Sequence, residues 1–326
     1  IETLRNELSE LDLKIIELVH RRQVLSEEIG AIKRKKGRPT RDYQREKLVI
    51  ELAKSHAKEL NVDPEMVVDL MQLLIQSSLK TQESARVKEE GQGNGKRALV
   101  IGGLGRMGGW FAEFMSMQGY EVHIADINIQ EEDESHFNSW RDTDDNYDIT
   151  VLATPLRQSI EILENILESG RRGIIFDIAS IKSPIKELLK EISDKGMKVT
   201  SIHPMFGPDT DLLTGKHVVF MNIDSHGTHL EIMKLFESTT AQMIEMSIDS
   251  HDYAISYVLG LSHIINIAFS KVLHDSGEKK DEFSQVSSTT FKDQIEVARR
   301  VSQENPNLYF EIQHLNSHSM QTIEEL

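Results

Sequence analysis

Apolar and polar positions alternate along the first 33 residues with the spacing of a long amphipathic helix. The intervals between apolar residues alternate between three and four, which predicts one helix with a coiled-coil-like seam. Arg22 occupies a seam position, where a cation is costly unless it reaches the surface or meets an anion. The apolar residues of the seam are Ile1, Leu4, Leu8, Leu11, Ile15, Leu18, Leu25, Ile29 and Ile32.

Two further helices are expected over residues 42–60 and 65–84, the second after a turn in which Asp63 is the N-cap and Pro64 the first helical residue. Ser78 and Gln82 lie one turn apart on the same face of this helix. Three helices of unequal length cannot bury so long an apolar seam by themselves. The pattern therefore predicts an all-α domain over residues 1–88 that forms an intertwined dimer.

After a polar, glycine-rich linker over residues 89–96, the pattern changes to short apolar runs separated by helical stretches. Such alternation predicts βαβ units and a mostly parallel sheet, here a Rossmann-like domain over residues 97–247. Beyond it only helical patterns occur, which predict a helical domain over residues 248–326. The expected strands cover residues 97–101, 121–125, 149–153, 173–178, 197–202 and 217–221, with an edge strand at 243–246, and the last helices cover 253–273, 284–305 and 308–326.

A glycine-rich turn joins the first expected strand to the helix that follows. Glycines allow a sharp turn and a close approach to a pyrophosphate, and the helix N-terminus offers free N–H groups. Asp126 ends the second strand, where a carboxylate would hold a ribose hydroxyl and repel a 2′-phosphate. The pattern indicates a dinucleotide site and favours NAD over NADP; the alternative is a glycine-rich turn in another α/β fold. The turn contains Gly103, Gly105, Arg106, Met107 and Gly108.

Composition narrows the possible classes of function. The chain has 326 residues, 39% of them hydrophobic and 28% charged, and no cysteine, which excludes disulfides, thiolate catalysis and cysteine-based metal sites. Residues 1–88 hold 17 basic and 15 acidic residues, whereas the remainder holds 20 and 38. An acidic body disfavours nucleic acid and anionic membranes as partners. No apolar run has the length of a membrane span and no signal peptide is evident, so we expect a cytoplasmic protein. We also expect no metal site.

Cations and amides gather in the first domain, beside only a few acids. Such a set suits a small dianion, because arginine forks match carboxylates with two hydrogen bonds each. It can catalyse a rearrangement by holding a compact charged transition state. The alternative is a dimerisation arm with a solvated basic loop. The residues concerned are Arg5, Arg22, Lys33, Arg38, Arg41, Arg45, Asp42, Glu46, Ser78 and Gln82.

The spacing of these residues over positions 1–85 resembles the all-helical class of chorismate mutase. The resemblance implies that Arg5 from the partner subunit, Arg22 and Arg45 bind the two substrate carboxylates. Lys33 and Gln82 would then meet the ether oxygen of the breaking bond. The remaining roles would be contacts with the ring hydroxyl by Asp42 and Glu46 and with a carboxylate by Ser78.

Two motifs of the second domain carry groups suited to proton transfer. A D-x-A-S-x-K sequence over residues 177–182 contains Ser180, and H-P-M-F-G-P over residues 203–208 begins with His203. A histidine at the carboxyl end of a strand lies where open α/β sheets bind ligands, and it could take the proton of a substrate hydroxyl. A structural histidine is the alternative.

The pair of motifs resembles prephenate dehydrogenase. The resemblance implies that His203 polarises the C4 hydroxyl of prephenate and that Ser180 hydrogen-bonds in the same site. It further implies that Arg300 binds a substrate carboxylate and that His251 and His263 lie near the substrate, although each histidine could equally be a helix residue satisfied by its neighbours.

The order of the domains resembles the bifunctional T-proteins of tyrosine biosynthesis, which implies chorismate and prephenate as substrates, NAD as cofactor, tyrosine as a possible feedback ligand and a homodimer. Two alternatives remain: specificity for arogenate, or a first domain that acts only in dimerisation or regulation. A 3-hydroxyacid-type dehydrogenase would require a catalytic lysine and asparagine instead. The family usually continues through further helices, whereas this sequence stops at Leu326, so we expect a shortened C-terminal region.

Overall fold

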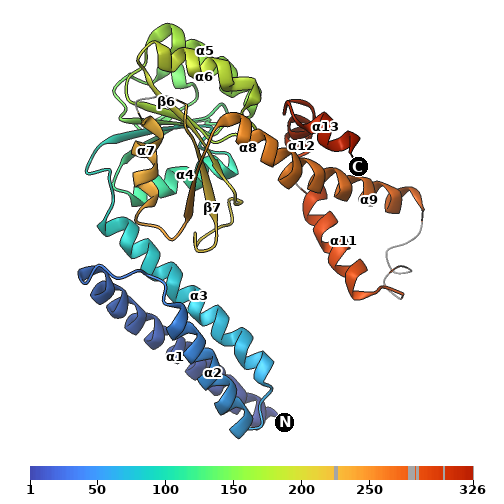
Figure 1. The fold of residues 1–326 in the computed structure, drawn as a ribbon. Helices are drawn as coiled ribbons and strands as arrows, with labels where there is room; N and C mark the ends of the chain where they lie inside the picture. Colours follow the sequence, from blue (N-terminus) through green and yellow to red (C-terminus); the bar gives the residue numbers. More distant parts are fainter. Residues whose placement is uncertain (224–226, 278–282, 284–285, 304, 326) are drawn as a thin grey trace.

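A computed structural model describes residues 1–223, 227–277, 283, 286–303 and 305–325, which form a three-helix unit, a sheet domain and a C-terminal group of helices (Figure 1). The three-helix unit confirms the expected elements. Asp42 and Asp63 are the N-caps of the second and third helices and accept hydrogen bonds of 3.0 Å from the amides of Arg45 and Glu65. The helices are α1 (Glu2–Lys35), α2 (Tyr43–Glu59) and α3 (Pro64–Glu89), the last of which runs five residues beyond its expected end.

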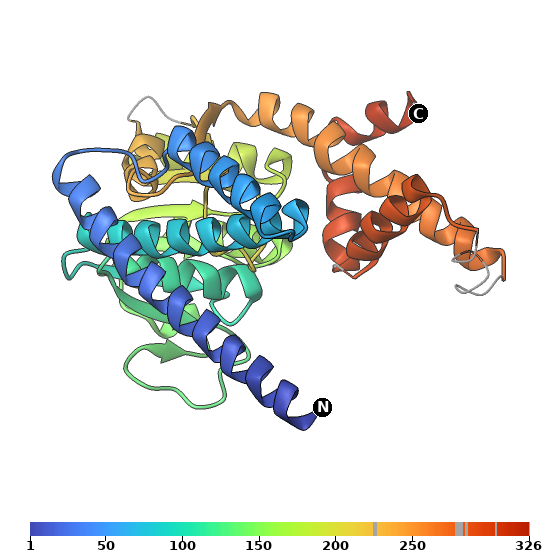
Figure 2. The same cartoon turned by 90° about the horizontal axis from the view of Figure 1, so that it is seen from below.

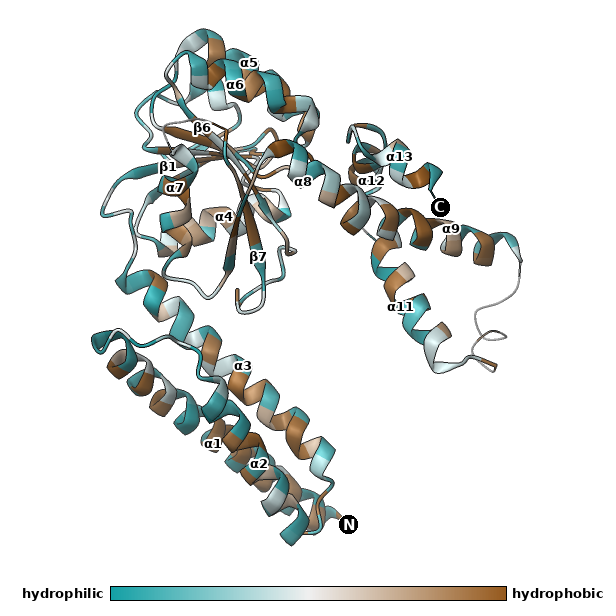
Figure 3. Ribbon diagram, viewed as in Figure 1, coloured by the Kyte–Doolittle hydropathy of each residue, from teal (hydrophilic) through white to brown (hydrophobic). Residues whose placement is uncertain are grey.

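The apolar seam of α1 faces solvent in the single chain. Leu11 and Ile15 are 54% and 53% exposed, and Leu48 of α2 and Leu73 of α3 are exposed as well. Brown apolar stripes are visible on all three helices in Figure 3, and Figure 2 shows α1 extending past the rest of the chain. Apolar surface of this extent is typical of a helix that packs against another protein surface.

The sheet has eight strands in the order β3-β2-β1-β4-β5-β6-β7-β8. Neighbouring strands are parallel except for β6 and β7, which are antiparallel. The short edge strand β3 was not expected, because two residues are too few to produce a pattern. The strands are β1 (Arg97–Ile101), β2 (Glu121–Ala125), β3 (His136–Phe137), β4 (Ile149–Leu152), β5 (Ile174–Asp177), β6 (Lys198–Pro204), β7 (His217–Met221) and β8 (Gln242–Met246).

Helices cover both faces of the sheet, so its strands are apolar on both sides. In β1, Leu99 belongs to the apolar cluster on the face of α5 and α6, and Val100 belongs to the cluster on the face of α4 and α7. Val87 of α3 joins the second cluster, so the third helix of the first unit packs near its end against the core of the sheet domain. The helices are α4 (Arg106–Met117), η1 (Trp140–Asp142), α5 (Leu156–Ser169), η2 (Ser183–Ile185), α6 (Lys186–Asp194), α7 (Thr228–Met233) and η3 (Lys234–Phe236).

The glycine-rich linker lies against the sheet domain. The amides of Gly93 and Gly95 donate to the carbonyl oxygens of Gln118 and Gly119 over 2.8 and 3.1 Å. A Cβ atom added at Gly93 would overlap the backbone of Gly119, so only glycine allows this approach.

The C-terminal helices stand beside the sheet domain and join it through α8 (Figures 1 and 2). The expectation of one helix over residues 308–326 is wrong for the described part, which contains two helices. Asn316 explains the break, because its amide donates to the carbonyl of Asp252 over 2.8 Å and accepts from the amide of His318. The expected helix over 284–305 is shorter, and residues 284, 285 and 304 lie outside the described part. The elements are α8 (Ile248–Ile255), the π-helical η4 (Ser256–Leu261), α9 (Ser262–Asp275), α11 (Thr289–Ser302), α12 (Pro306–His314) and α13 (Ser319–Glu324).

Elements α8, η4 and α9 form one continuous helix, Ile248–Asp275, which by length and composition alone is apolar enough to cross a membrane. The sequence analysis did not find this stretch, because serine, histidine and asparagine residues interrupt it. Its first turns carry His251 and Asp252, which are buried against the sheet domain. The beginning of this helix is therefore packed on protein.

Candidate functional sites

The three helices of the first unit enclose a cavity of about 320 Å³. Arg5 lies outside it, on the exposed beginning of α1. The cavity collects side chains that are up to 60 residues apart in sequence. Seven of the eight residues expected in the first site line it, namely Arg22, Lys33, Asp42, Arg45, Glu46, Ser78 and Gln82.

Arg22 points into this cavity and not to the surface. Its guanidinium donates to the carbonyl of Leu74 over 2.6 Å and to the hydroxyl of Ser78. Burial lowers the pKa of Arg22, and no carboxylate of the described residues forms an ion pair with it. A half-buried cation that is bonded only to neutral groups is the natural counterpart of an anionic ligand.

Lys33 and Gln82 are held by two buried residues that the sequence analysis missed. The ammonium of Lys33 donates to the carbonyl of Thr40 over 2.6 Å, and the amide of Gln82 donates to Ser26 over 2.7 Å. The Oε1 atom of Gln82 is buried and has no hydrogen-bond partner among the described residues. Rotating this amide would let Oε1 accept from Ser26 and would free its N–H groups for a ligand. Helical spacing from Arg22 was the available signal for Ser26.

The acids of this cavity already have partners. Asp42 caps α2, and Glu46 accepts three hydrogen bonds from Arg41, at 3.1, 3.3 and 3.0 Å. These bonds raise the pKa of Arg41. By contrast, the guanidinium of Arg45 has no ion pair with a described residue, so it remains available to a bound carboxylate.

The glycine turn has the geometry of a cradle for a dinucleotide. Gly102 has a φ of +84°, and a Cβ atom added at Gly108 would overlap its carbonyl oxygen. Asp126, at the end of β2, accepts from the amide of Leu104 over 3.1 Å, which directs its carboxylate at the turn. Helix α4 begins directly after Gly105, so its free N–H groups face the same space.

Two other residues of the turn lie at the beginning of α4. Met107 is half-buried and packs against the apolar cluster on the α4 face. Arg106 is exposed and forms an ion pair of 2.8 Å with Asp209, a residue of the loop that follows β6. The loop after β6 therefore contacts the helix beginning that follows the glycine-rich turn.

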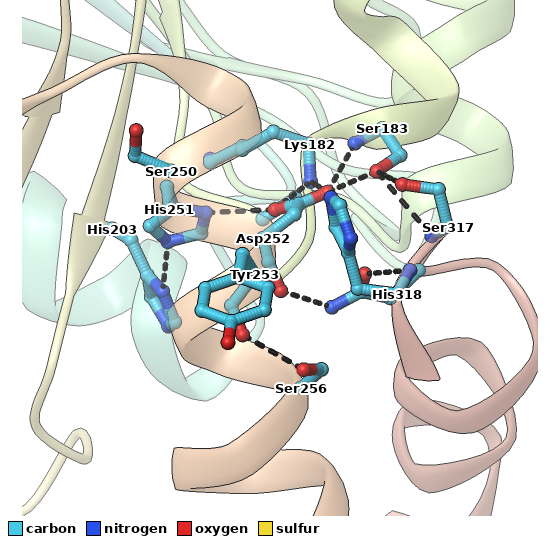
Figure 4. A network of polar contacts seen from close by, with 12 residues as sticks. Lys182, Ser183, His203, Ser250, His251, Asp252, Tyr253, Ser256, Ser317 and His318 are labelled. Carbon is cyan, nitrogen blue, oxygen red and sulfur yellow. Dashed lines mark hydrogen bonds and ion pairs between the residues drawn. The ribbon is translucent and has the colours of Figure 1, made fainter. Parts of the chain in front are cut away.

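A buried chain of polar groups begins at His203, at the carboxyl end of β6 (Figure 4). His203 is 5% exposed, and its Nδ1 lies 2.9 Å from Nε2 of His251. The Nδ1 of His251 lies 2.7 Å from a carboxylate oxygen of Asp252. Asp252 also accepts from the amide of Lys182 at 3.1 Å and from the hydroxyl of Ser183.

This chain fixes the tautomers of both histidines. Burial alone would raise the pKa of Asp252, but hydrogen bonds from His251 and Ser183 outweigh it and leave the pKa below its ordinary value. The ionised Asp252 only accepts, so Nδ1 of His251 carries a proton and its Nε2 accepts from Nδ1 of His203. Burial, with the nearby His251 and Lys182, keeps the pKa of His203 well below 6.5. Nε2 of His203 is therefore an unprotonated base.

Lys182 forms a buried ion pair with Asp177. Its ammonium donates to Asp177 over 2.7 Å and to the carbonyl of Ile202 over 2.8 Å, and both charged side chains are fully buried. Burial lowers the pKa of Lys182, although Asp177 opposes the change. The sequence analysis assigned no role to Lys182, Asp252 or Ser183. The signal for the first was the five-residue separation of acid and lysine in D-x-A-S-x-K.

The remaining residues expected in the second site are not hydrogen-bonded to His203. Ser180 is half-buried between β5 and η2. The ring centroid of His263 lies 4.6 Å from that of Tyr309, and Nδ1 of His263 is buried with no hydrogen bond to any residue that the structure describes. Arg300 is exposed on α11, and its guanidinium has no hydrogen bond or ion pair with a described residue, whereas Arg299 pairs with Glu296.

Three family models match successive parts of the chain. Residues 4–83 match the model described as chorismate mutase type II. Residues 113–245 match the nucleotide-binding domain of prephenate dehydrogenase, and residues 247–326 match its dimerization domain. The three models follow the order of the three groups of elements in the fold.

Similar proteins cover either the whole chain or one of its parts. The T-protein of Enterobacter agglomerans is 21% identical over 96% of this chain and 81% of its own length. The chorismate mutase of Methanocaldococcus jannaschii is 31% identical over 29% of this chain and 93% of its own length. Among solved structures, the prephenate dehydrogenase of A. aeolicus in complex with hydroxyphenyl propionate and NAD+ has a TM-score of 0.57 at 22% identity, covering 71% of this chain and 86% of that chain, which shows a common fold.

Proposed function

The chain belongs to the family of bifunctional chorismate mutase/prephenate dehydrogenases, the T-proteins of tyrosine biosynthesis, and we propose that the two clusters described above are its two active sites. The helical cavity rearranges chorismate to prephenate. The sheet domain then oxidises prephenate to 4-hydroxyphenylpyruvate with NAD. The observation that carries the mutase assignment is the collection of seven expected residues in one cavity. The buried base His203 carries the dehydrogenase assignment.

In the mutase site, electrostatic stabilisation replaces acid–base catalysis. Arg22 and Arg45, which have no carboxylate partners among the described residues, bind the two carboxylates of chorismate, with Ser78 beside one of them. Lys33 and the freed amide of Gln82 donate to the ether oxygen, where negative charge grows as the C–O bond breaks. Asp42 and Glu46, at the beginning of α2, contact the ring hydroxyl.

In the dehydrogenase site, the glycine turn and the first turn of α4 hold the pyrophosphate of NAD, and Asp126 holds its ribose. The close packing at Gly108 and the direction of the Asp126 carboxylate support this assignment, and a carboxylate there disfavours a 2′-phosphate. Bound NAD supplies the acceptor for the hydride that leaves C4 of the substrate. Arg106, which pairs with Asp209, would add a positive charge beside the turn that favours the pyrophosphate.

His203 takes the proton of the C4 hydroxyl through Nε2, while Nδ1 keeps its hydrogen bond to His251. Loss of the ring carboxylate as carbon dioxide returns electrons to the ring, and the resulting phenolate takes the proton back. Because both ring nitrogens of His251 have partners, we assign it to positioning His203 and not to binding substrate. Ser180, His263 and Arg300 provide the substrate contacts, with the unpartnered Nδ1 of His263 as the supporting observation.

The molecule acts as a cytoplasmic homodimer in this proposal. A second copy would cover the apolar seam of α1 and would bring its Arg5 to the neighbouring cavity. The exposed apolar residues of the seam support a two-fold contact of this kind. Tyrosine is the candidate feedback ligand. Light scattering of the purified protein measures the dimer, and both rates measured with added tyrosine test the feedback.

One reaction mixture tests both activities in order. Protein is added to chorismate, NAD follows later, and chorismate loss and NADH formation are recorded separately. We expect chorismate loss before NAD is added and NADH formation only afterwards. NADH formation from arogenate but not from prephenate would assign the second site to arogenate. No loss of chorismate would refute the mutase site and leave the first domain as a dimerisation or regulatory unit.

A further inference from the structure

Glu83 is a buried acid of the mutase helix α3, and its hydrogen-bond partners among the described residues lie in the dehydrogenase. One oxygen of its carboxylate accepts from the amide and the hydroxyl of Thr240, over 2.6 and 2.9 Å. The other accepts from the amide of Leu213 over 3.1 Å. Glu83 is 4% exposed and directly follows Gln82 of the mutase cavity. Its carboxylate therefore satisfies backbone groups of the sheet domain and none of its own helix.

The segment that contains Leu213 connects the two parts of the dehydrogenase site. Residues 205–216 follow His203 and β6 directly. Along this loop, the ring of Phe206 lies 5.0 Å from that of Trp110 on α4, and the carbonyl of Thr210 accepts from the Trp110 indole over 2.9 Å. The ion pair between Asp209 and Arg106 joins the same loop to the glycine turn.

We propose that Glu83 is a positioning residue of the dehydrogenase, which holds the loop of residues 205–216 against the first turn of α4 and so completes the dinucleotide site. This inference rests on the proposed function, because it takes the glycine turn as the site of NAD. It makes a residue of the mutase domain part of the support for the second reaction. No side-chain atom of Glu83 contacts His203 or the turn in the described structure, so the effect passes through the loop.

The hydrogen bonds of Glu83 depend on its carboxylate, so substituting this residue should have a measurable cost. Hydrogen bonds to a buried carboxylate are stronger than those between neutral groups, and their loss leaves buried N–H groups unsatisfied. Burial raises the pKa of Glu83, against which the hydrogen bonds from Thr240 and Leu213 act. A second link between α3 and the loop, the ion pair of Lys80 with Asp211, is exposed and contributes little by comparison.

Three variants of the full chain separate this role from a general one: Glu83→Ala, Glu83→Gln and, as the matched control on the same interface, Asp211→Asn. The dissociation constant of NAD is measured by calorimetric titration, and KM and kcat are measured with prephenate. For Glu83→Ala we expect the dissociation constant and the KM of NAD to rise about five- to tenfold, because only part of the lost hydrogen-bond energy reaches the turn. The kcat at saturating NAD and the mutase rate should remain near those of the unchanged protein.

Glu83→Gln should give a smaller rise, because a glutamine keeps one accepting oxygen for Thr240 but turns an N–H group toward the amide of Leu213. Asp211→Asn should leave NAD affinity unchanged. If Glu83→Ala loses the mutase rate and helical circular dichroism, it has misfolded, and Glu83→Gln alone decides. Unchanged NAD affinity in a folded Glu83 variant, or a fall in kcat without a change in KM, overturns the inference. An unchanged protein that binds no NAD refutes the proposed cofactor site and this inference together.

Discussion

The Nδ1 atom of His203 donates a hydrogen bond to Nε2 of His251 over 2.9 Å, and Asp252 fixes the direction of that bond from the far side of His251. The proton of His251 is therefore on Nδ1, which faces Asp252, and the proton of His203 is on Nδ1, which faces His251. The proposed base of the dehydrogenase, His203, is thus oriented by Asp252 through a chain of two hydrogen bonds.

Replacing Asp252 by Asn should reverse this chain. The amide would donate to Nδ1 of His251, its Nε2 would carry the proton, and Nε2 of His203 would then be protonated and unable to act as a base. We expect dehydrogenase kcat to fall about 100-fold or more, the usual contribution of a general base. Asp249→Asn, an exposed change on the same helix, is the control. A kcat within about twofold of the unchanged protein would contradict the assignment of the tautomers.

Stability should fall as the solution becomes acidic. Burial lowers the pKa of His203, His251 and His263 below 6.5, so at acidic pH the unfolded chain binds more protons than the folded chain. Above the ordinary pKa of histidine, these residues make their full contribution to the free energy of unfolding. This contribution is lost as pH falls below that value. Urea denaturation at a series of pH values measures the free energy of unfolding as a function of pH. The variant His203→Asn should reduce the slope of that dependence. An equal slope in the variant would show that His203 is not the cause.

The buried pair of Lys182 and Asp177 should be necessary for folding stability. Lys182→Met leaves Asp177 charged and unpaired, which should lower the free energy of unfolding by about 3–5 kcal/mol. The double variant with Asp177→Asn should recover much of this loss. Lys186→Met, which removes an exposed pair with Asp249, should change stability little. A double variant no more stable than Lys182→Met would mean that the uncompensated charge is not the source of the loss.

Gly108→Ala should weaken NAD binding without affecting the mutase. The added Cβ atom would overlap the carbonyl oxygen of Gly102 and displace the turn from α4. Gly109→Ala is a neighbouring control, because its Cβ atom would lie at an ordinary 3.6 Å from the backbone of Gly103. Titration with NAD distinguishes the two. Equal affinities would place the pyrophosphate elsewhere.

Regular patterns made most of the fold predictable. The three-four spacing predicted α1, and the apolar runs predicted the parallel strands of the sheet, because burial on both faces leaves a strong signal. The break between α12 and α13 was not predictable, since it depends on the contact of Asn316 with the carbonyl of Asp252, 64 residues away. Strand β3 was missed because its two residues contain no periodicity.

Motifs and helix faces indicated many of the residues that the structure groups in the candidate sites. Spacing along α1 and α3 identified Arg22, Ser78 and Gln82, which the cavity brings together. The partner of Lys33, the carbonyl of Thr40, gave no signal because backbone groups are the same at every position. Glu83 was missed for a related reason, since its role depends on how α3 meets the sheet domain.

The central claim is that two separate active sites lie in this chain, and a reciprocal pair of variants tests it most directly. Mutase and dehydrogenase rates are measured on the same preparations of Lys33→Ala and His203→Asn, each shown to be folded. We predict that Lys33→Ala loses chorismate rearrangement and still oxidises prephenate, whereas His203→Asn loses oxidation and still rearranges chorismate. Either variant keeping the activity assigned to its residue, or both activities falling together in both variants, would contradict the account.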